Sequence, residues 1–479
     1  MASFRANKAR AERIGRQRPT VERRISSAER RRNGQVRVGG HPANGNGHER
    51  SAGPDSDRDD SSRPGGAVSG ATASLLNHTT QLARLLITAL EGRRWLDAYL
   101  LAAGMDQIVA DQLHPESDRP DGARPGSELP LVWARRLASL VDRLADAVAG
   151  QAPAPARRGE LVDEGLALAH DLGRLPERFR RDLVRLPACF HHLDQEPADL
   201  GRLVDLFAER WPDRERPLLA VGVRSSGSYL APLHAALLRA RGYQSVRVLT
   251  VRPGHGLLEP ERGLVRSLAR RGGLALLCDD PPVTGASIAR VANELQGAGL
   301  PADAIVLLLQ LFAGESLPPN LHRFHAVLLP WIRWAVIERL RPERVERMVS
   351  DLLAPGSSLV CATPVPLPKP RSPRRHARAR YRLRVRDATG VERDEEIVVE
   401  GAGLGYFGAA AAAGSARGPR VFGIENGLLY REWLPEEETP RAVEPLDEDS
   451  RRAESAVESL GGARRFPVAE DLGLGVQPA

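Results

Sequence analysis

The stretch LALLCDDPPVTGASIARVANELQGAGL, residues 274–300, combines three patterns that together indicate the fold. An apolar run, 274–278, ends in two adjacent acids, Asp279 and Asp280. A short segment of threonine, glycine, alanine and serine follows, and apolar residues then recur at helical spacing. A fully apolar run before a helix is typical of a strand in a sheet covered on both faces. The stretch therefore predicts a strand–loop–helix unit with a polar loop at the carboxyl end of the strand.

The same rhythm extends over the neighbouring sequence. Helical patterns alternate with five apolar runs, which lie at 218–223, 246–251, 274–278, 305–311 and 326–329. Such alternation predicts an α/β fold, in which a parallel sheet carries helices on both faces.

The acid pair requires a chemical partner. Two carboxylates at a strand end repel each other, and they are tolerated where a cation or hydroxyl groups satisfy them. Thr284 to Ser287 then supply hydroxyls and the free N–H groups of a helix start, which suit a phosphate. Acids for a sugar diol beside a phosphate cradle describe a sugar-phosphate site. The local alternative, in which Asp279 caps a turn and Ser287 caps a helix, remains open.

A second strand end has unusual composition. In VGVRSSGSYLAP, residues 221–232, a strand runs into Arg224, Ser225, Ser226 and Gly227 before a helix. Small residues let the backbone approach an anion, and an arginine adds a charge-assisted hydrogen bond. An ordinary strand-to-helix turn is the alternative.

These two motifs carry a resemblance. LALLCDDPPVTGAS resembles the signature of the type I phosphoribosyltransferases, and VGVRSSGSYLAP resembles the pyrophosphate loop of that family. One strand separates the motifs, in the order that the family has. The resemblance covers about 120 residues, approximately 216–335, and implies a phosphoribosyltransferase-like domain over 216–352.

The resemblance implies a role for each matching position. The ribose hydroxyls of phosphoribosyl pyrophosphate would contact Asp279 and Asp280, directly or through Mg²⁺, which makes these two acids the expected catalytic and metal-binding residues. The 5′-phosphate would contact Thr284, Gly285, Ala286 and Ser287. The pyrophosphate would contact Arg224, Ser225, Ser226 and Gly227. A loop after the second strand would add Arg252 and His255 as anion contacts.

The expected function is therefore transfer of a phosphoribosyl group to or from an unidentified base. Pro281 and Pro282 replace an aliphatic pair of the family and stiffen the loop. No motif marks the base, although Trp331 and Trp334 follow the last strand and either stack on it or pack in the core. The alternative is a non-catalytic, nucleotide-sensing regulatory protein of the same fold.

The remaining sequence divides by composition. Residues 1–72 form an arm predicted to be disordered, and 73–215 have helical periodicity. Residues 353–378 are rich in proline and arginine and predict a linker, 379–436 predict a small strand-rich module, and 437–479 form an acidic tail. The whole chain has a net charge of +7. Residues 1–50 hold 13 Lys or Arg and 4 Glu, a charge of about +9, so residues 51–479 together carry a net charge near −2. The arm is either a solvated tail or a nucleic-acid contact.

Two interpretations compete for the 379–436 module. The sequence EEIVVEGAGLGYFG, residues 395–408, has the glycines of a dinucleotide-binding turn, but Tyr406 stands where the third glycine belongs. The module has a weaker resemblance to the small lobe of aminoglycoside-phosphotransferase-like kinases, with Glu400 near the position of the phosphate-binding lysine.

The cysteines, two histidines and the hydropathy of the chain bear on metal binding and on the cellular compartment. Cys189, Cys278 and Cys361 are too far apart for a metal motif, and Cys278 fits a core position. His191 and His192 are adjacent and predict surface or hinge positions. No apolar stretch is long enough to span a membrane, and the first thirty residues lack a secretory pattern. We therefore expect a cytoplasmic protein, and a homo-oligomer is compatible with this interpretation.

Overall fold

The structure is a computed structural model, and it describes residues 78–113, 128–150, 155–367, 376–409 and 419–434. The predicted arm, 1–72, and the predicted tail, 437–479, lie outside the described residues. No helix in the described ranges is both long and apolar enough to cross a membrane.

The region before residue 215 is helical, as predicted. Leu137, Leu140 and Leu144 line one stripe of α3 and are fully buried, because helical spacing places them on one face. The helices are α1 (Thr79–Glu91), α2 (Trp95–Gln112), α3 (Glu128–Val148), α4 (Pro155–Leu172), α5 (Glu177–Arg181), α6 (Ala188–His191) and α7 (Pro197–Arg210).

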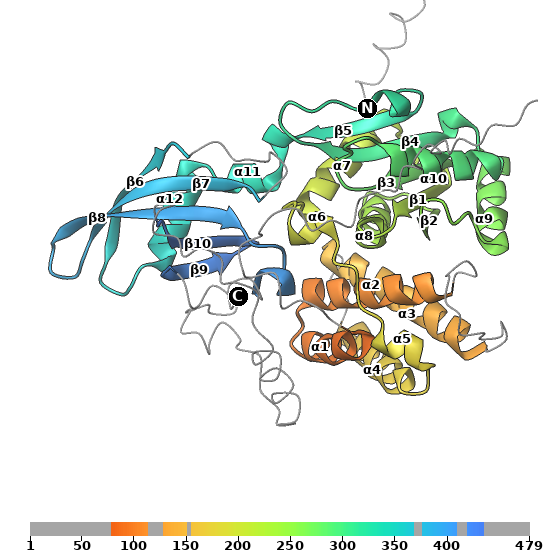
Figure 1. Ribbon diagram of the computed structural model, residues 1–479, viewed down its shortest axis with the longest axis horizontal. Helices are drawn as coiled ribbons and strands as arrows, with labels where there is room; N and C mark the ends of the chain where they lie inside the picture. Colours follow the sequence, from red (N-terminus) through yellow and green to blue (C-terminus); the bar gives the residue numbers. More distant parts are fainter. Residues whose placement is uncertain (1–77, 114–127, 151–154, 368–375, 410–418, 435–479) are drawn as a thin grey trace, which may run out of the picture. The chain divides into compact units, whose positions relative to one another are not determined.

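A five-stranded parallel sheet follows, in the order β2-β1-β3-β4-β5 (Figure 1). The sequence prediction of its first four strands matches the structure, and β5 is one residue longer at each end than predicted. Strands β1, β3 and β4, whose only polar side chain is that of Gln310, are buried along their whole length. The strands are β1 (Leu218–Val223), β2 (Val246–Val251), β3 (Leu274–Cys278), β4 (Ile305–Leu311) and β5 (His325–Pro330).

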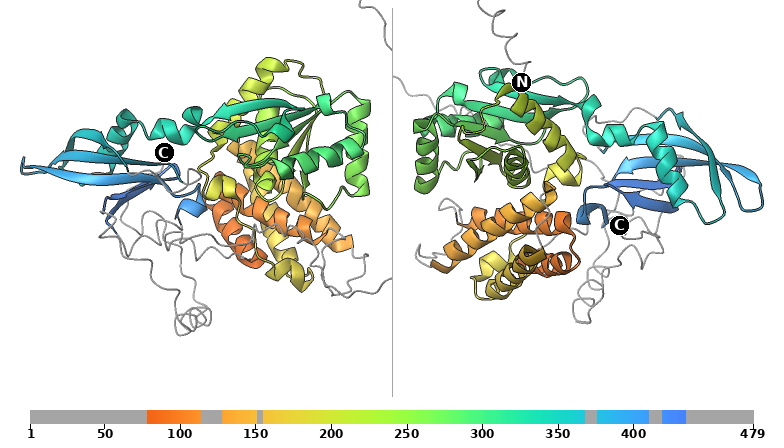
Figure 2. Two further views of the ribbon diagram at one scale, coloured as in Figure 1. Left: turned by 45° about the horizontal axis from the view of Figure 1, so that its top comes forward. Right: turned by 180° about the vertical axis from the view of Figure 1, so that it is seen from behind.

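Helices cover both faces of this sheet. The chain moves from β1 to β2 in one direction and from β2 to β3 in the other, so right-handed crossovers place α8 opposite α9 and α10. Helix α8 packs on β1 and β2, and α2, α3 and α7 pack against α8 (Figure 2). These helices are α8 (Gly227–Ala240), α9 (Glu259–Arg270) and α10 (Ala286–Gly297), and the short helices that follow are η1 (Ala302–Ala304), η2 (Pro319–Leu321), η3 (Trp331–Arg333), α11 (Ala335–Arg339) and α12 (Pro342–Leu352).

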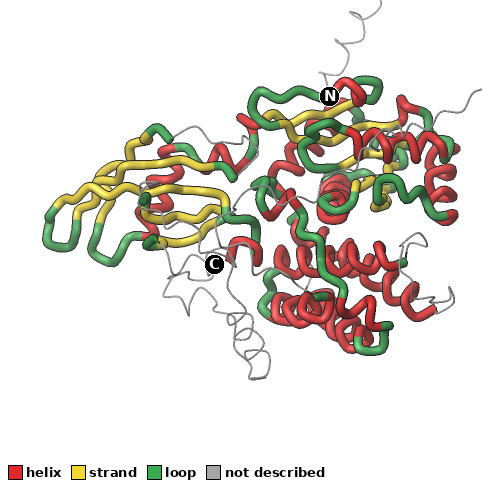
Figure 3. The backbone as a smooth tube through the Cα atoms, in the orientation of Figure 1, coloured by secondary structure: helices red, strands yellow, loops and turns green. Residues whose placement is uncertain are grey.

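A second sheet is antiparallel, in the order β6-β7-β8-β10-β9, and Figure 3 shows its strands in yellow. Alternation sets its two faces: Tyr381, Leu383 and Val385 of β7 are buried, whereas the arginines between them pair with acids of β8. The strands are β6 (Ser358–Val365), β7 (Arg378–Arg386), β8 (Glu392–Gly401), β9 (Val421–Glu425) and β10 (Leu428–Glu432).

The second sheet corrects two sequence interpretations. Part of the predicted linker 353–378 is strand β6, which pairs with β7. Its proline, Pro364, is compatible with this position because β6 is an edge strand. The glycines at 401–405 do not open a parallel crossover, because β8 pairs antiparallel with both β7 and β10. Glu400 forms ion pairs with Arg378 and Arg431, at 2.9 and 2.6 Å.

The cysteines are unpaired with one another. Cys278 is fully buried in β3, as its apolar setting predicted, and Cys189 is buried in α6, whereas Cys361 is exposed.

Candidate functional site

The two sequence motifs follow neighbouring strands. β1 lies between β2 and β3, and the chain leaves β1 on one side and returns to β3 on the other. Such a reversal of strand order opens a crevice beyond the carboxyl ends of the strands, where open α/β sheets bind ligands. The loops after β1 and β3 therefore share the edge of the sheet at which a ligand is expected.

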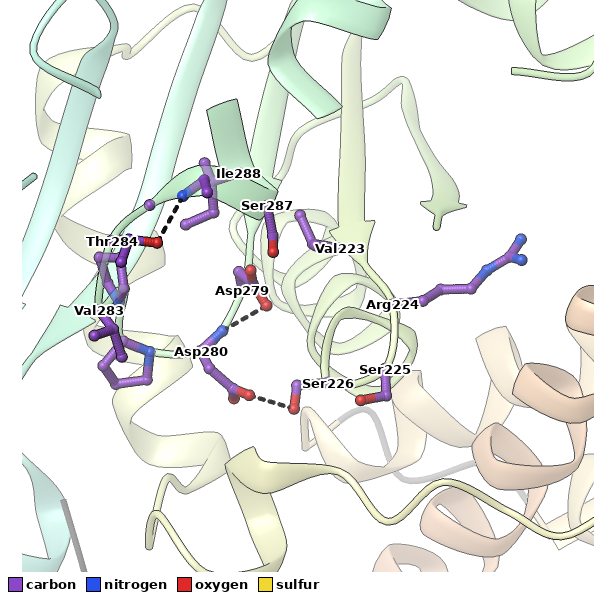
Figure 4. Close-up of a pocket in the computed structure, with 14 residues that line it drawn as sticks. Val223, Arg224, Ser225, Ser226, Asp279, Asp280, Val283, Thr284, Ser287 and Ile288 are labelled. Atoms are coloured by element: carbon purple, nitrogen blue, oxygen red, sulfur yellow. Dashed lines mark hydrogen bonds between the residues drawn. The ribbon is translucent and has the colours of Figure 1, made fainter. Parts of the chain in front are cut away.

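These loops line one open cavity of about 290 Å³ (Figure 4). Every lining residue comes from the two loops or the ends that flank them. The lining comprises Val223, Arg224, Ser225, Ser226, Asp279, Asp280, Pro281, Pro282, Val283, Thr284, Gly285, Ala286, Ser287 and Ile288. The structure thus brings together all but three of the predicted site residues, the exceptions being Gly227, Arg252 and His255.

Two glycines shape the loop after β1. A Cβ atom on Gly222 would lie 2.0 Å from the carbonyl oxygen of Gly227, so the strand end and the helix start touch through their backbones. The peptide bond between Arg224 and Ser225 is cis. Within the described part of the chain, the N–H groups of Ser225 and Ser226 have no hydrogen-bond acceptor. Both residues line the cavity, so both can offer N–H donors to an anion.

The loop after β3 ends in a second set of donors. Gly285 has φ 69°, a left-handed conformation that suits glycine, and it is the residue before α10. The N–H of Ala286 bonds to the hydroxyl of Thr284 at 3.3 Å. The N–H groups of Ser287 and Ile288, in contrast, have no acceptor among the described residues. The start of α10 therefore faces the cavity with free donors and the positive end of its dipole.

The two acids lie between these donor sets and are half-buried. The Ser226 hydroxyl donates to Asp280 Oδ2 at 2.6 Å, and the N–H of Asp280 donates to Asp279 Oδ1 at 2.9 Å. Burial, and then the charge of Asp280, raise the pKa of Asp279 well above its ordinary value. A cation or a pair of sugar hydroxyls at this position would favour the ionised form.

The acids fit Mg²⁺ bound together with a phosphorylated ligand. In the described ranges, no three His, Cys, Asp or Glu side chains form a group that could hold a metal. Mg²⁺ in phosphate sites takes one or two carboxylates and completes its shell with phosphate oxygens and water. Asp279 and Asp280 supply that number of carboxylates.

The predicted arginines turn away from the cavity. Arg224 points outward in Figure 4, and its Nη1 lies 3.1 Å from Asp111 Oδ1 at the end of α2. It also donates to the hydroxyl and carbonyl of Thr250, and its side chain is only 7% exposed. Arg252 binds the same carboxylate, with Nε 2.9 Å from Asp111 Oδ1. His255 is not part of the cavity lining.

The two tryptophans lie outside the cavity lining. Trp334 is fully buried, donates its indole N–H to Leu329 O at 3.2 Å, and packs with Trp331 and Phe312. Of the two alternatives for Trp334, the structure confirms core packing. Trp331 is half-buried in the same aromatic group.

Sequence reasoning missed the residues behind the loop after β1. Gln107 and Asp111 of α2 contact it, and the N–H groups of Ala188 and Cys189 in α6 donate to the Ser226 hydroxyl at 3.0 and 3.4 Å. These positions belong to ordinary helical patterns or short connections, so no local motif marks them. His191 is half-buried and His192 is exposed, and their Nδ1 atoms lie 3.4 Å apart.

No family model, curated protein or solved structure matches this chain. The case for a function therefore rests on the cavity and its chemistry.

Proposed function

We propose that this protein binds phosphoribosyl pyrophosphate and transfers its phosphoribosyl group to a base. One observation carries the proposal: two sets of free N–H donors and a carboxylate pair line one cavity at the reversal of strand order. A ligand that matches them has two anionic groups separated by vicinal hydroxyls. A ribose with phosphate on C5 and pyrophosphate on C1 has that arrangement.

Each part of the cavity has a task in this proposal. The 284–287 segment and the start of α10 bind the 5′-phosphate through N–H groups and hydroxyls. Asp279 and Asp280 accept hydrogen bonds from the ribose hydroxyls. Ser225 and Ser226 donate N–H groups to the pyrophosphate. Mg²⁺, when bound, neutralises the charge of the pyrophosphate group.

The reaction is a displacement at the anomeric carbon. The bond from C1 to the pyrophosphate oxygen breaks, and its electron pair leaves with pyrophosphate. A bond forms between C1 and a nitrogen of the base, which releases its proton to solvent. The transition state resembles an oxocarbenium ion, so fixed donors on the leaving group and correct positioning provide the rate enhancement.

The cavity also favours a second candidate, a nucleotide-binding regulatory protein. All lining residues belong to these two loops or to the strand and helix ends that flank them, and no described residue from another element lines the cavity. Binding without turnover needs only these loops. The two candidates therefore share the ligand site and differ in whether a base reacts.

Calorimetry on the full chain tests the shared site. We expect Mg²⁺-dependent binding of phosphoribosyl pyrophosphate, weakened roughly a hundredfold in Asp279→Asn/Asp280→Asn, because two charge-assisted bonds are lost. Asp303→Asn is the matched control, since Asp303 is exposed and precedes β4 at the opposite edge of the sheet. Absence of binding to the unaltered protein, or full binding by the double variant, would refute the proposal.

A second assay separates enzyme from regulator. Pyrophosphate release is measured with a panel of purine and pyrimidine bases in the presence of phosphoribosyl pyrophosphate and Mg²⁺. Release with any base establishes transfer, whereas binding without release across the panel favours the regulatory candidate.

A further inference from the structure

Gln107 of α2 is a buried polar residue with both ends of its amide engaged. Its side chain is next to the candidate pyrophosphate loop, and the residue is only 1% exposed. Nε2 donates to the carbonyl of Ser225 at 3.3 Å, and Oε1 accepts the N–H of Arg185 at 3.1 Å. Since the amide has a distinct partner at each end, its orientation is fixed.

The bond to Ser225 determines where the next N–H points. Among the described residues, the cis peptide bond is the one between Arg224 and Ser225. The peptide bond between Ser225 and Ser226 is therefore trans. In a trans peptide the carbonyl and the N–H point in opposite directions. With the carbonyl of Ser225 directed toward α2, the N–H of Ser226 is directed away from α2, and Ser226 lines the cavity.

The helical region holds all three residues of this loop. Asp111 binds the side chain of Arg224 and Gln107 binds the carbonyl of Ser225, while the N–H of Ala188 donates to the Ser226 hydroxyl. The N–H of Ser228, at the start of α8, also donates to the carbonyl of Ser225, at 3.1 Å, so Gln107 and α8 hold this carbonyl together.

We propose that Gln107 is a positioning residue for the pyrophosphate subsite, and that the helical region is thereby part of the site. The inference rests on the proposed function, in which Ser225 and Ser226 bind pyrophosphate. Gln107 touches no substrate. It aims the N–H of Ser226 by holding the opposite end of the same peptide group, so its loss lowers affinity for pyrophosphate and leaves the 5′-phosphate subsite intact.

Two probes separate these subsites in calorimetry on the full chain. Inorganic pyrophosphate with Mg²⁺ reports on the loop after β1, and ribose 5-phosphate reports on the loop after β3. Gln107→Leu keeps the side-chain volume and removes both hydrogen bonds. We expect its pyrophosphate affinity to fall about tenfold, the equivalent of one hydrogen bond, with ribose 5-phosphate affinity unchanged.

Asp146→Asn is the matched control. Asp146 of α3 binds Arg239 of α8 at 2.7 Å, so the variant disturbs another contact between the helical region and α8, remote from the loop. It should bind both probes as the unaltered protein does. Equal losses for both probes in Gln107→Leu, or an unchanged pyrophosphate affinity, would overturn the inference. Ribose 5-phosphate that fails to bind the unaltered protein contradicts the proposed function instead.

Hydrogen exchange on the unaltered protein gives a test that does not depend on the folding of a variant. Pyrophosphate with Mg²⁺ should slow amide exchange in a peptide covering 224–230 and in one covering the end of α2, because Gln107 joins them. Ribose 5-phosphate should not slow exchange in α2. Protection by pyrophosphate that omits α2 would contradict the inference.

Discussion

The Ser226 hydroxyl lies 2.6 Å from Asp280 Oδ2, so the loops after β1 and β3 are joined by a direct hydrogen bond. The residues are 54 positions apart and Ser226 is buried. The same hydroxyl accepts N–H groups from α6. Ser226 therefore connects the acid pair, the donor loop and the helical region at one atom.

Replacing Ser226 should destabilise the protein. Ser226→Ala leaves the N–H groups of half-buried Ala188 and buried Cys189 without their acceptor, which costs about 1–3 kcal/mol of unfolding free energy. Urea unfolding measures this loss. Ser228→Ala is the control, because the Ser228 hydroxyl is buried and has no hydrogen-bond partner among the described residues. A loss in Ser228→Ala as large as that in Ser226→Ala would contradict the assignment.

Gly285 should not tolerate a side chain. Its φ is 69°, and a Cβ atom would lie 2.8 Å from Leu321 Cδ1. Gly285→Ala should lower the unfolding free energy by about 1–2 kcal/mol through the left-handed conformation alone, and should weaken ribose 5-phosphate binding. Gly297→Ala is the comparison, because Gly297 ends α10 and a Cβ atom there meets nothing within 4 Å. An equal effect of both substitutions on binding would argue against a role for the Gly285 turn.

Asp106 should make stability depend on pH. Burial raises its pKa to about 6, an effect that the charge of Arg224 opposes and that of Asp111 reinforces. A raised folded-state pKa means that the folded protein binds this proton more tightly than the unfolded chain does. The contribution of protonated Asp106 to the free energy of unfolding is therefore lost as pH rises from about 4 to about 6. Asp106→Asn should therefore gain stability relative to the unaltered protein over that interval.

Urea unfolding at several pH values measures this difference. Asp205→Asn, at an ion pair with Arg241 on the surface, controls for the loss of one carboxylate. A difference between Asp106→Asn and the unaltered protein that stays constant from pH 4 to pH 7 would show that Asp106 does not titrate in this way.

His376 should titrate above its ordinary range. Burial alone would lower the pKa of His376. The hydrogen bond to Asp194, 2.7 Å from Oδ1 to Nδ1, and the charges of Asp194 and Glu400 outweigh burial, so the pKa is raised overall. Its contribution to stability should be complete below about pH 6.5 and disappear as pH rises through the folded-state pKa.

Nuclear magnetic resonance titration of the imidazole tests this assignment. Asp194→Asn should lower the His376 midpoint, because the hydrogen bond and the charge of Asp194 are lost. A midpoint that does not move in Asp194→Asn would remove Asp194 as the cause.

Sequence patterns predicted the parallel sheet closely because its strands are buried on both faces. β1 and β3 are uninterrupted apolar runs and β4 is interrupted only by Gln310, and such runs leave little freedom in where a strand begins and ends. Strand β6 was missed because its burial is irregular and it contains proline, as an edge strand can.

The sequence by itself determined where the candidate site lies. Carboxyl ends of parallel strands meet at one edge of a sheet, so the motifs after β1 and β3 had to approach each other. Residue types at those ends then indicated anion donors and an acid pair.

Only the tertiary structure decided which groups face the cavity. Arg224 was expected to bind an anion, yet its partner Asp111 lies 113 positions away on α2 and draws the side chain outward. The N–H of Ser226 is aimed by Gln107, from the same helix. Helix α2 reaches this loop because it packs against α8, and no local pattern encodes a contact that depends on how two distant segments pack.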